Sequence, residues 1–437
     1  MNKLPVGWIS TKFTEVLDVT GGTQPPKSQF TSEPAIGYIR LLQIRDFGKK
    51  PVPTYIPVSP KWRKCEKNDV LIGRYGASIG RICTGMEGVF NVALAKVITP
   101  DEIDKRFLKY YLSSDLFQKP LSMLSRSAQN GFNKKDLANF DFYIAPLNEQ
   151  IRIADKLDSI LAKVNKAQSR LDKIPAILKR FRQSVLAAAT SGELTKEWRE
   201  FNKVDKGSWQ QVSIDELSSR AFDGPFGSKL KTADYTEFGV KVVRLENIGH
   251  LTFKGDKETF ISEKKYQDLI KNTLEHNDIL FSSFVDEEIR TCLFEARDNT
   301  YINKADCFCI RVSEEKISPK FLMYNLGCKH TFDKIKKQVH GVTRPRINLR
   351  FLKSFEVSVP TVEEQIRIVE IIDALFHKAA KVEAQFLETK SKLDRLTQSI
   401  LAKAFRGELV SQSDKDESAE ALLKRIKAES PKVKSNK

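Results

Sequence analysis

The sequence predicts an α+β protein in which two globular modules alternate with two long helices, arranged as a pseudo-twofold internal repeat. Two observations predict this fold: short motifs return about 215 residues later, and a heptad of apolar residues follows each module. We expect a module at 1–145, a helix at 146–192, a module at 193–359, a helix at 360–410 and a basic tail at 411–437.

The repeat is visible as paired motifs. Asn68-Asp69-Val70-Leu71 returns as Asn277-Asp278-Ile279-Leu280, and Glu149-Gln150-Ile151-Arg152-Ile153 returns as Glu364-Gln365-Ile366-Arg367-Ile368. The distance between copies grows from 209 to 215 residues along the modules and then stays at 215 through both helices. The modules therefore differ by insertions, whereas the helices keep one register.

Both helices carry apolar residues at alternating spacings of four and three, the signature of a coiled-coil seam. In the first helix the seam is complete: Ile153, Leu157, Ile160, Val164, Ala167, Leu171, Ile174, Leu178, Phe181, Val185 and Ala188. In the second it includes Thr389 and Lys403. We expect an antiparallel intramolecular coiled coil, with a break near Pro175. The alternative is that each helix packs on its own module.

The modules read as short strands, turns and one helix each. Residues 38–44 and 89–98 favour strands, and the glycines from Gly73 to Gly80 favour a hairpin turn. Thr99-Pro100-Asp101-Glu102 predicts a helix that continues to Leu112, and Ser318-Pro319 predicts the same helix in the second module. Residues 417–429 favour a short helix in the tail.

Composition favours a folded protein with a polyanionic partner. Hydrophobic residues make up 41% and charged residues 30%, and the net charge is +17. The charge is uneven: +8 over residues 1–145 but +2 over 191–359. No apolar run is long enough to span a bilayer, the N-terminus lacks a signal peptide, and six cysteines without paired spacing fit reduced thiols, so we expect a cytoplasmic protein.

One stretch in each module combines Lys and Arg with amides, which suits phosphates and base edges of DNA. The alternative is a solvated loop rich in turn-forming residues. Gln43 and Arg45 follow a strand in the first module, at a position that Asn247 matches in the second, and Arg74 and Tyr75 lie in a glycine-rich turn. Together with the two basic stretches, these positions give the candidate DNA-binding residues: Gln43, Arg45, Arg74, Tyr75, Arg126, Gln129, Asn130, Asn133, Lys134, Lys135, Asn247, Lys336, Lys337, Arg344, Arg346, Asn348 and Arg350.

No motif that carries chemistry is present. The sequence has no P-loop, no Asp/Asn-Pro-Pro-Tyr/Phe and no His-Glu-x-x-His, which weakens the alternative of an enzyme with its own active site that modifies or cleaves DNA. Cys307 and Cys309 with Cys328 and His330 are a poor match to zinc spacing. We expect no metal, no cofactor and no catalytic residue on this chain.

The motif that begins at Pro146 and enters the first helix, with its copy at Pro360, resembles the specificity subunits of type I restriction–modification enzymes. The helix ends, Gln183-Ser184-Val185-Leu186 and Gln398-Ser399-Ile400-Leu401, and the opening Leu4-Pro5-Val6-Gly7-Trp8 resemble that family too. The resemblance covers nearly the whole chain. Module 2 departs from it, with Asp223-Gly224-Pro225-Phe226-Gly227 in place of the Gly21-Gly22-Thr23 turn.

The resemblance implies a non-catalytic subunit of a host-defence complex. Each module would be a target recognition domain that reads one half of a split, asymmetric DNA site, and the helices would set the spacing. They would also dock two methyltransferase subunits and the restriction subunits, which would carry S-adenosylmethionine, ATP and magnesium. The repeated motif supplies the candidate interface residues: Glu149, Gln150, Arg152, Glu364, Gln365 and Arg367.

Overall fold

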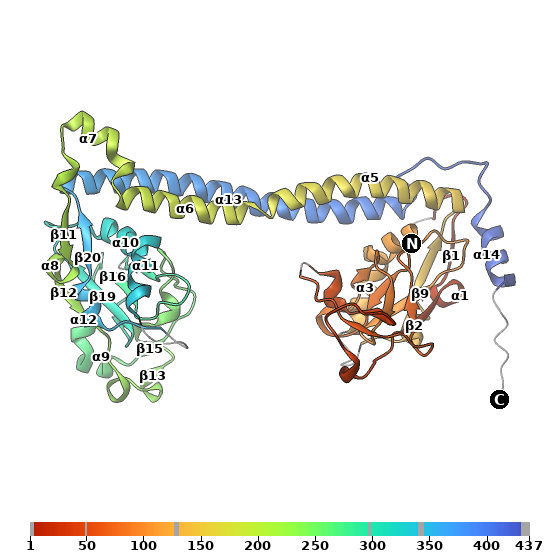
Figure 1. The fold of residues 1–437 in the computed structure, drawn as a ribbon, viewed down its shortest axis with the longest axis horizontal. Helices are drawn as coiled ribbons and strands as arrows, with labels where there is room; N and C mark the ends of the chain where they lie inside the picture. The colour runs from red at the N-terminus through yellow and green to blue at the C-terminus, as the bar shows by residue number, and fades with distance from the viewer. Residues whose placement is uncertain (1–3, 49, 126–130, 296–298, 340–344, 430–437) are drawn as a thin grey trace. The chain divides into compact units, whose positions relative to one another are not determined.

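The structure, a computed structural model, describes residues 4–48, 50–125, 131–295, 299–339 and 345–429. The chain forms two compact units. Unit 1 comprises residues 1–171 and 388–437, and unit 2 comprises residues 172–387 (Figure 1). Both predicted helical blocks are thus divided between the units, because each unit takes the helix that leaves its module and part of the opposite helix.

Unit 1 contains three small sheets with strand orders β1-β10, β2-β9-β6-β7 and β4-β3-β8-β5. The strands are β1 (Ile9–Lys12), β2 (Asp18–Gly21), β3 (Tyr38–Leu42), β4 (Tyr55–Pro57), β5 (Lys64–Cys65), β6 (Leu71–Gly73), β7 (Ile82–Cys83), β8 (Gly88–Phe90), β9 (Leu94–Ile98) and β10 (Asp141–Ile144). The helices are α1 (Phe13–Val16), α2 (Lys105–Ser113), α3 (Asp115–Ser125), α4 (Lys134–Leu137), α5 (Leu147–Leu171) and α14 (Ala419–Glu429).

Unit 2 also contains three sheets, with strand orders β11-β20, β12-β19-β16-β17 and β13-β15-β14-β18. The strands are β11 (Gln210–Ser213), β12 (Ser218–Phe222), β13 (Tyr235–Thr236), β14 (Val240–Val243), β15 (Phe260–Ile261), β16 (Ile279–Ser282), β17 (Thr291–Leu293), β18 (Tyr301–Asn303), β19 (Cys307–Val312) and β20 (Glu356–Val359). The helices are α6 (Ile174–Thr190), α7 (Lys196–Asn202), α8 (Ile214–Leu217), α9 (Glu263–Leu269), α10 (Pro319–Gly327), α11 (Lys329–Gln338) and α12 (Leu349–Ser354).

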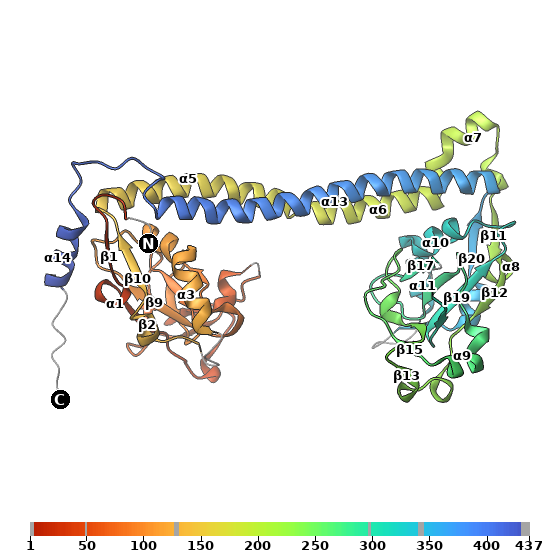
Figure 2. The same cartoon turned by 180° about the vertical axis from the view of Figure 1, so that it is seen from behind.

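The two modules share their topology. The first strand of each module pairs antiparallel with its last, β1 with β10 and β11 with β20 (Figure 2). The sheets β2-β9-β6-β7 and β12-β19-β16-β17 have matching order, and each third sheet has one parallel pair, β3 with β8 or β14 with β18. The predicted internal repeat is therefore confirmed as a structural duplication.

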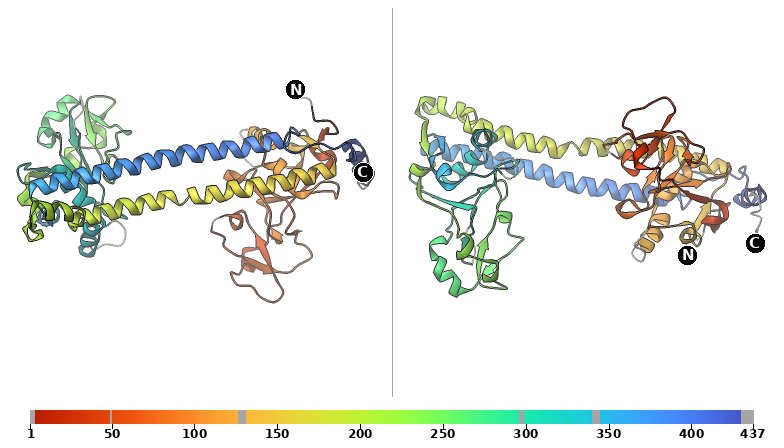
Figure 3. Two further views of the ribbon diagram at one scale, coloured as in Figure 1. Left: turned by 90° about the horizontal axis from the view of Figure 1, so that it is seen from above. Right: turned by 60° about the horizontal axis from the view of Figure 1, so that its bottom comes forward.

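The first long helix is broken and the second is continuous. Helix α5 ends at Leu171 and α6 begins at Ile174 with Pro175 in its first turn, so the predicted break is confirmed. Helix α13 (Val362–Ala404) has no break. In unit 1, α5 runs beside the last part of α13; in unit 2, α6 runs beside the first part (Figure 3). Both pairings are antiparallel.

Each module's core contains the start of its own helix and the end of the other helix. In unit 1, Ile153 and Leu157 of α5 share a core with Leu401 of α13. In unit 2, Ile368 of α13 shares a core with Leu186 of α6. Each long helix therefore packs against the other helix, as the coiled-coil interpretation predicts. Where it begins, it also packs on the core of its own module, as the alternative interpretation predicts.

The predicted heptad is wrong at the helix ends. Leu186 and Ala189 are buried in place of Ala188, and Leu401 and Ala404 are buried in place of Lys403. Each end contacts a module as well as a helix, so a wider stripe than a coiled-coil seam is covered. Val382 and Leu396, both predicted seam positions, are exposed.

Three predicted element bounds need correction and two are confirmed. The strand predicted at 38–44 is β3, which ends at Leu42. Helix α2 begins at Lys105 and not at Pro100, because the side chain of Asp104 accepts the backbone N–H groups of Arg106 and Phe107 and caps it. The predicted strand 89–98 is two strands, β8 and β9, which pair in different sheets. Ser318 caps α10 as predicted, and the predicted tail helix is α14, whose apolar face joins the core of unit 1.

None of the described helices is both long enough and apolar enough to cross a membrane. This agrees with the absence of a long apolar run in the sequence.

Replacing Phe405 tests whether the end of α13 belongs to the core of unit 1. Its ring lies 5.3 Å from the rings of both Phe107 and Tyr111 and is almost fully buried. Phe405→Ala should destabilise unit 1 by about 3–5 kcal/mol and speed hydrogen exchange along α2. The exposed Phe201 of α7 gives the control, since Phe201→Ala should change stability by less than about 0.5 kcal/mol. Equal effects of the two variants would contradict the packing.

Asp69 gives unit 1 a pH-dependent contribution to stability. Burial raises the pKa of Asp69, but hydrogen bonds from Lys105 and Lys96 outweigh it and lower the pKa to about 2. A carboxyl with a lower pKa in the folded state stabilises the fold above its unfolded pKa, here near 3.8, and loses this effect as pH falls towards 2.

Asp69→Asn should therefore cost about 2 kcal/mol of stability at pH 7 and progressively less between pH 4 and pH 2. Denaturant unfolding of both proteins across this range measures the difference. Asp141→Asn, which breaks an exposed ion pair to Lys12, should cost at most about 1 kcal/mol. A cost for Asp69→Asn that does not change with pH would show that the charge is not the cause.

Candidate nucleic-acid interface

Four loops meet at one surface of each module. In unit 1 they are residues 21–24, 43–47, 73–81 and 131–135, which we call the loop surface of unit 1. Contacts join them: the Nε of Arg74 donates to the carbonyl of Phe132 at 3.4 Å, and the Nη1 of Arg81 to that of Ile44 at 3.5 Å. The loop surface of unit 2 comprises residues 223–226, 244–247, 282–290 and 345–348. Here the Nη1 of Arg290 donates to the carbonyl of Leu245 at 3.1 Å and the N–H of Ile347 to that of Ser283 at 2.9 Å, and the first and last loops line one cavity.

The turn after the first strand of the larger sheet is the same in both modules. A Cβ atom added to Gly22 would clash with the backbone of Phe90 and Asn91, and one added to Gly224 would clash with the backbone of Lys304. Only glycine fits such a close backbone approach. Gly224 in unit 2 is therefore structurally equivalent to Gly22 in unit 1, although the neighbouring residues of the two turns differ.

The hairpins also correspond, as their backbone hydrogen bonds show. The N–H of Gly73 donates a hydrogen bond to the carbonyl of Arg81, and in the same way the N–H of Ser282 donates to the carbonyl of Arg290. The N–H of Arg74 bonds the carbonyl of Ala93 at 2.9 Å, as that of Ser283 bonds Asp306 at 2.9 Å. Arg74 thus corresponds to Ser283, and Ala93 to Asp306. The hairpin predicted between Gly73 and Gly80 is formed by β6 and β7.

In unit 1 the predicted residues reach the loop surface in three groups. Arg74 and Tyr75 lie at the hairpin, with the guanidinium 5.0 Å from the centre of the Tyr75 ring. Gln43 and Arg45 both bond the hydroxyl of Thr54 at 3.3 Å, and Arg45 is exposed.

The third group lies at the start of α4. The side chain of Asn133 caps the helix by accepting the N–H of Lys135, so its oxygen has a structural role. Lys134 pairs with Asp18 at 2.7 Å, and Lys135 is exposed. Arg126, Gln129 and Asn130 lie outside the described residues, as does Arg344 of the second module.

The expectation for Asn247 is wrong. Its side chain is buried, donates to the carbonyls of Lys254 and Lys257 at 2.8 Å, and accepts the backbone N–H of Arg244. The same cap in unit 1 is made by Asp46, which accepts the N–H of Gln43. Asn247 therefore corresponds to Asp46, and the residue that corresponds to Gln43 is Arg244.

The other candidates in unit 2 fall in two places. Lys336 and Lys337 are exposed on α11, where Lys336 lies 5.3 Å from the centre of the Phe332 ring. Arg346 is exposed at the loop surface, in a β-bridge with Phe284. Asn348 caps α12 by accepting the N–H of Phe351, as Asn133 caps α4, and Arg350 is exposed on α12.

The loop surface of unit 2 also contains acidic residues, which are not among the predicted DNA-binding residues. Asp223, Phe226, Asp306 and Arg346 line a cavity of about 330 Å³ together with Phe308, Ile347, Asn348 and Leu349. Burial, together with the charge of Asp306, raises the pKa of Asp223 to about 6. A search for basic residues could not find this cavity, although the unusual turn at Asp223 was a visible signal.

Four of the six candidate interface residues are wrong because they are buried within their own unit. Glu149 accepts the indole N–H of Trp8 at 3.0 Å, and Glu364 accepts that of Trp209 at 3.0 Å. The glutamines that follow them, Gln150 and Gln365, bond the backbone before α2 and α10. Their side-chain oxygens accept hydrogen bonds from the backbone N–H groups of Asp104 and Ser318. None of these four side chains is available to a partner subunit.

The other two candidates are accessible but have partners. Arg152 is bonded to Asp416 at 2.6 Å and to the carbonyl of Ser411. Arg367 is exposed and pairs with Glu370 one turn further along α13.

The exposed face beside these motifs is repeated too. Ile151 is 36% exposed and its copy Ile366 is 52% exposed. Along the same helix face follow exposed positions of matching character, Asp155 and Glu370, Ser159 and Ala374, and Lys166 and Lys381, whereas Ala162 corresponds to an unlike residue, His377. We call these ten residues the repeated stripes, one in each unit. A single exposed apolar side chain is common on any surface. An isoleucine exposed at the same place in both copies is nevertheless consistent with a surface that serves the same partner twice.

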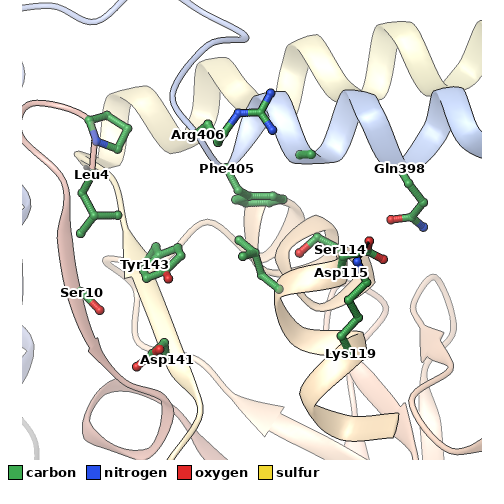
Figure 4. A pocket seen from close by; sticks show the side chains of 13 residues that line it. Leu4, Ser10, Ser114, Asp115, Lys119, Asp141, Tyr143, Gln398, Phe405 and Arg406 are labelled. Atoms are coloured by element: carbon green, nitrogen blue, oxygen red, sulfur yellow. Dashed lines mark ion pairs between the residues drawn. The ribbon is translucent and has the colours of Figure 1, made fainter. Parts of the chain in front are cut away.

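A larger cavity, of about 620 Å³, lies in unit 1 between β1, β10, α3 and the end of α13 (Figure 4). Phe405 and Tyr143 form its apolar wall, and the ion pair of Asp115 with Lys119 lies at its rim. In unit 2 the equivalent ion pair has the opposite polarity, since Lys329 stands at the position of Asp115 and Asp333 at that of Lys119. The rim is therefore not repeated, which argues against a partner common to both units at this place.

Metal-binding geometry is not found in the part of the chain that the structure describes. No three His, Cys, Asp or Glu side chains gather there in a way that could hold an ion. The six cysteines are free and buried. Burial raises the pKa of the Cys307 and Cys309 thiols, which further disfavours thiolate ligands.

Comparison with known proteins gives one consistent match. A sequence model described as the type I restriction modification DNA specificity domain matches twice, at residues 5–176 and 208–389. The chain is 29% identical over 443 residues to the type I restriction enzyme EcoBI specificity subunit of Escherichia coli, covering 97% of this chain and 92% of that protein. It is 28% identical to the EcoKI specificity subunit of Escherichia coli K12, covering 98% and 96%.

Solved structures agree with this match at the level of the fold. A chain from a structural study of assembly and conformational transition in the type I R-M system has a TM-score of 0.70 at 20% identity, over 93% of this chain and 100% of that chain. The HsdS subunit from Thermoanaerobacter tengcongensis has a TM-score of 0.50 at 19% identity, over 93% and 98%. Since the family match covers both modules and most of both helices, the chain belongs to the type I restriction modification DNA specificity family.

Proposed function

We propose that this chain is the DNA specificity subunit of a type I restriction–modification complex, and that each module binds one half of a bipartite, asymmetric DNA site. One observation carries the proposal: the two loop surfaces share their backbone hydrogen bonds and differ in their side chains. A common scaffold with unlike side chains suits two unlike half-sites read in the same way.

DNA contact in unit 1 is assigned to Arg45, Arg74, Tyr75 and Lys135, with Gln43 and Lys134 beside them. In unit 2 it is assigned to Arg244, Arg346 and Arg350, with Lys336 and Lys337 on α11. The net charge of +2 over residues 191–359 is consistent with a local contact and not with a uniformly basic module.

The repeated stripes suit two copies of one partner, because each unit presents an exposed isoleucine, an acid, a small residue and a lysine at matching positions of its helix. We assign them to two methyltransferase subunits. Restriction subunits, with ATP and magnesium, would join that assembly, and S-adenosylmethionine would belong to the methyltransferase. In this proposal the chain itself holds no cofactor and no catalytic group, and its six free, buried cysteines suit the cytoplasm.

The competing function is an enzyme with its own active site. The acidic pair that comes closest to resembling an active site is Asp223 with Asp306. Among the described residues that line its cavity there is no nucleophile and no third carboxylate. Purified chain incubated with DNA and S-adenosylmethionine, or with DNA and magnesium, should therefore neither methylate nor cleave it. Product formed by the isolated chain would establish the competing function.

Exchange of one module tests the division of labour between the two. Residues 1–145 replaced by the equivalent module of a relative should change one half of the methylated motif and leave the other half and the spacing unchanged. Methylome sequencing of cells that carry the chimaera with its methyltransferase partner measures both halves. The reciprocal exchange of residues 193–359 is the control, and a change in both halves from either exchange would refute the model.

The docking assignment predicts the effect of a charge in each repeated stripe. Ile151→Arg should weaken binding of one methyltransferase subunit, Ile366→Arg the other, and the double variant both, by about 1–3 kcal/mol at each site. Analytical ultracentrifugation of the reconstituted complex counts the subunits bound. Leu387→Arg is the matched control: Leu387 is 60% exposed on α13, and its copy at 172 is an aspartate. Full assembly by the double variant would exclude the stripes as the docking surface.

A further inference from the structure

The cavity at the loop surface of unit 2 is acidic where the equivalent place in unit 1 is basic. In unit 1, a Cβ atom added to Gly21 would lie 2.5 Å from Nη1 of Arg74, so the guanidinium fills the space beside this turn. In unit 2 the residue that corresponds to Gly21 is Asp223, and the residue that corresponds to Arg74 is Ser283. The two backbones match, but the space beside this turn is filled by the guanidinium of Arg74 in unit 1, whereas in unit 2 it carries the carboxylate of Asp223.

Hydrogen bonds hold the acidic group in place. The Oδ1 of Asp223 accepts the N–H of Gly224 at 2.7 Å and that of Asp306 at 3.0 Å. Among the described residues no donor is recorded for its second oxygen, Oδ2. Asp306 is fixed as well, because its Oδ1 accepts the hydroxyl of Ser283 at 2.8 Å.

The remaining lining suits a flat, partly apolar ligand with an amino group. Phe226 is 55% exposed and lies at the cavity with Asp223. Arg346 is 3.8 Å from Oδ1 of Asp306, so it balances part of the negative charge without bonding Asp223. A phosphate would be repelled by the two carboxylates, whereas a base edge that presents hydrogen-bond donors would be attracted.

Resting on the proposed function, we propose that Asp223 is a specificity-determining residue. It accepts a hydrogen bond from the exocyclic amino group of a cytosine in the half-site of module 2, and the backbone N–H of Asp306 positions its carboxylate. An ionised carboxylate only accepts hydrogen bonds. In the major groove cytosine presents an amino donor, whereas adenine presents its amino group next to the acceptor N7, and guanine presents two acceptors. Cytosine is therefore the base that a carboxylate fits best.

Arg74 of unit 1 provides the contrast. A guanidinium at the equivalent place suits the two acceptors of guanine. The two modules would thus present opposite hydrogen-bonding groups on one scaffold.

Asp223→Asn tests the inference in the complete complex. Asparagine keeps one oxygen for the backbone N–H groups of Gly224 and Asp306, and replaces the second oxygen by an amide donor. That donor cannot accept a hydrogen bond from the amino group of cytosine but suits the N7 acceptor of a purine. Methylation is measured on oligonucleotides in which each base pair of the module 2 half-site is replaced in turn. At one position the wild type should prefer cytosine, and the variant should lose roughly ten- to hundredfold of that preference and gain activity with a purine.

Two further variants keep the test decisive. Asp306→Asn, at a residue with φ of 68° where asparagine is well tolerated, keeps the backbone N–H that bonds Asp223 but removes one of the two negative charges of the cavity. It should therefore weaken the same preference at the same position, and by less than Asp223→Asn does. The double variant D223G/S283R copies the pattern of unit 1 and should transfer the preference to guanine. Asp256→Asn, an exposed carboxylate elsewhere on the module, should change nothing.

The outcomes separate the inference from the proposed function. If the wild-type chain directs no methylation with its partner, the proposed function fails. If the wild type is active but Asp223→Asn and Asp306→Asn keep its preference at every position, or if no position requires cytosine, the inference alone is overturned. A change confined to the half-site of module 1 would also overturn it.

Discussion

In each unit, a buried carboxylate at the start of the long helix joins that helix to its module. Glu149 and Glu364 each accept a tryptophan N–H from the beginning of their own module, and each is almost completely buried. A third segment completes each junction, and it follows the end of the opposite helix. Because a buried carboxylate without partners is very costly, the module, its helix and the segment after the other helix must come together as one unit. This requirement ties the helix pairing to the folding of the modules.

The two junctions use different chemistry for the same purpose. Glu364 is met by the guanidinium of Arg199 from α7, which follows α6 directly. Glu149 has an amide in that role, from Gln412 in the tail. Burial raises the pKa of Glu149 in spite of the hydrogen bond from Trp8. Unit 1 therefore depends on residues that follow α13. The helix α14 is folded onto the same core for a separate reason, because its apolar residues Leu422 and Ile426 are buried there.

Repetition in the sequence predicted the fold well and the site poorly, for one physical reason. A residue that is kept in two copies meets the same constraint twice, but that constraint can be a core or a partner. The Glu-Gln-Ile-Arg motif contains both: Glu149 and Gln150 are buried, while Ile151 beside them is exposed. Spacing also failed between the modules, since insertions made Asn247 the apparent match of Gln43. The burial of Asn247 and the hydrogen bond that it accepts from the N–H of Arg244 show that it is a buried cap.

The differences between the modules therefore carry more information about DNA reading than their likenesses. A close approach of backbones requires glycine at both Gly22 and Gly224, so these positions cannot vary and cannot distinguish one base from another. The neighbouring positions are free of that constraint, and there Arg74 is replaced by Ser283 and an acid is gained at Asp223. Net charge conceals the exchange, because removing a guanidinium and adding a carboxylate also makes a module less basic. This exchange accounts for two of the six charges by which residues 1–145 (+8) and residues 191–359 (+2) differ. A small net charge is thus compatible with a recognition surface that presents acceptor groups, and by itself it does not count against DNA binding.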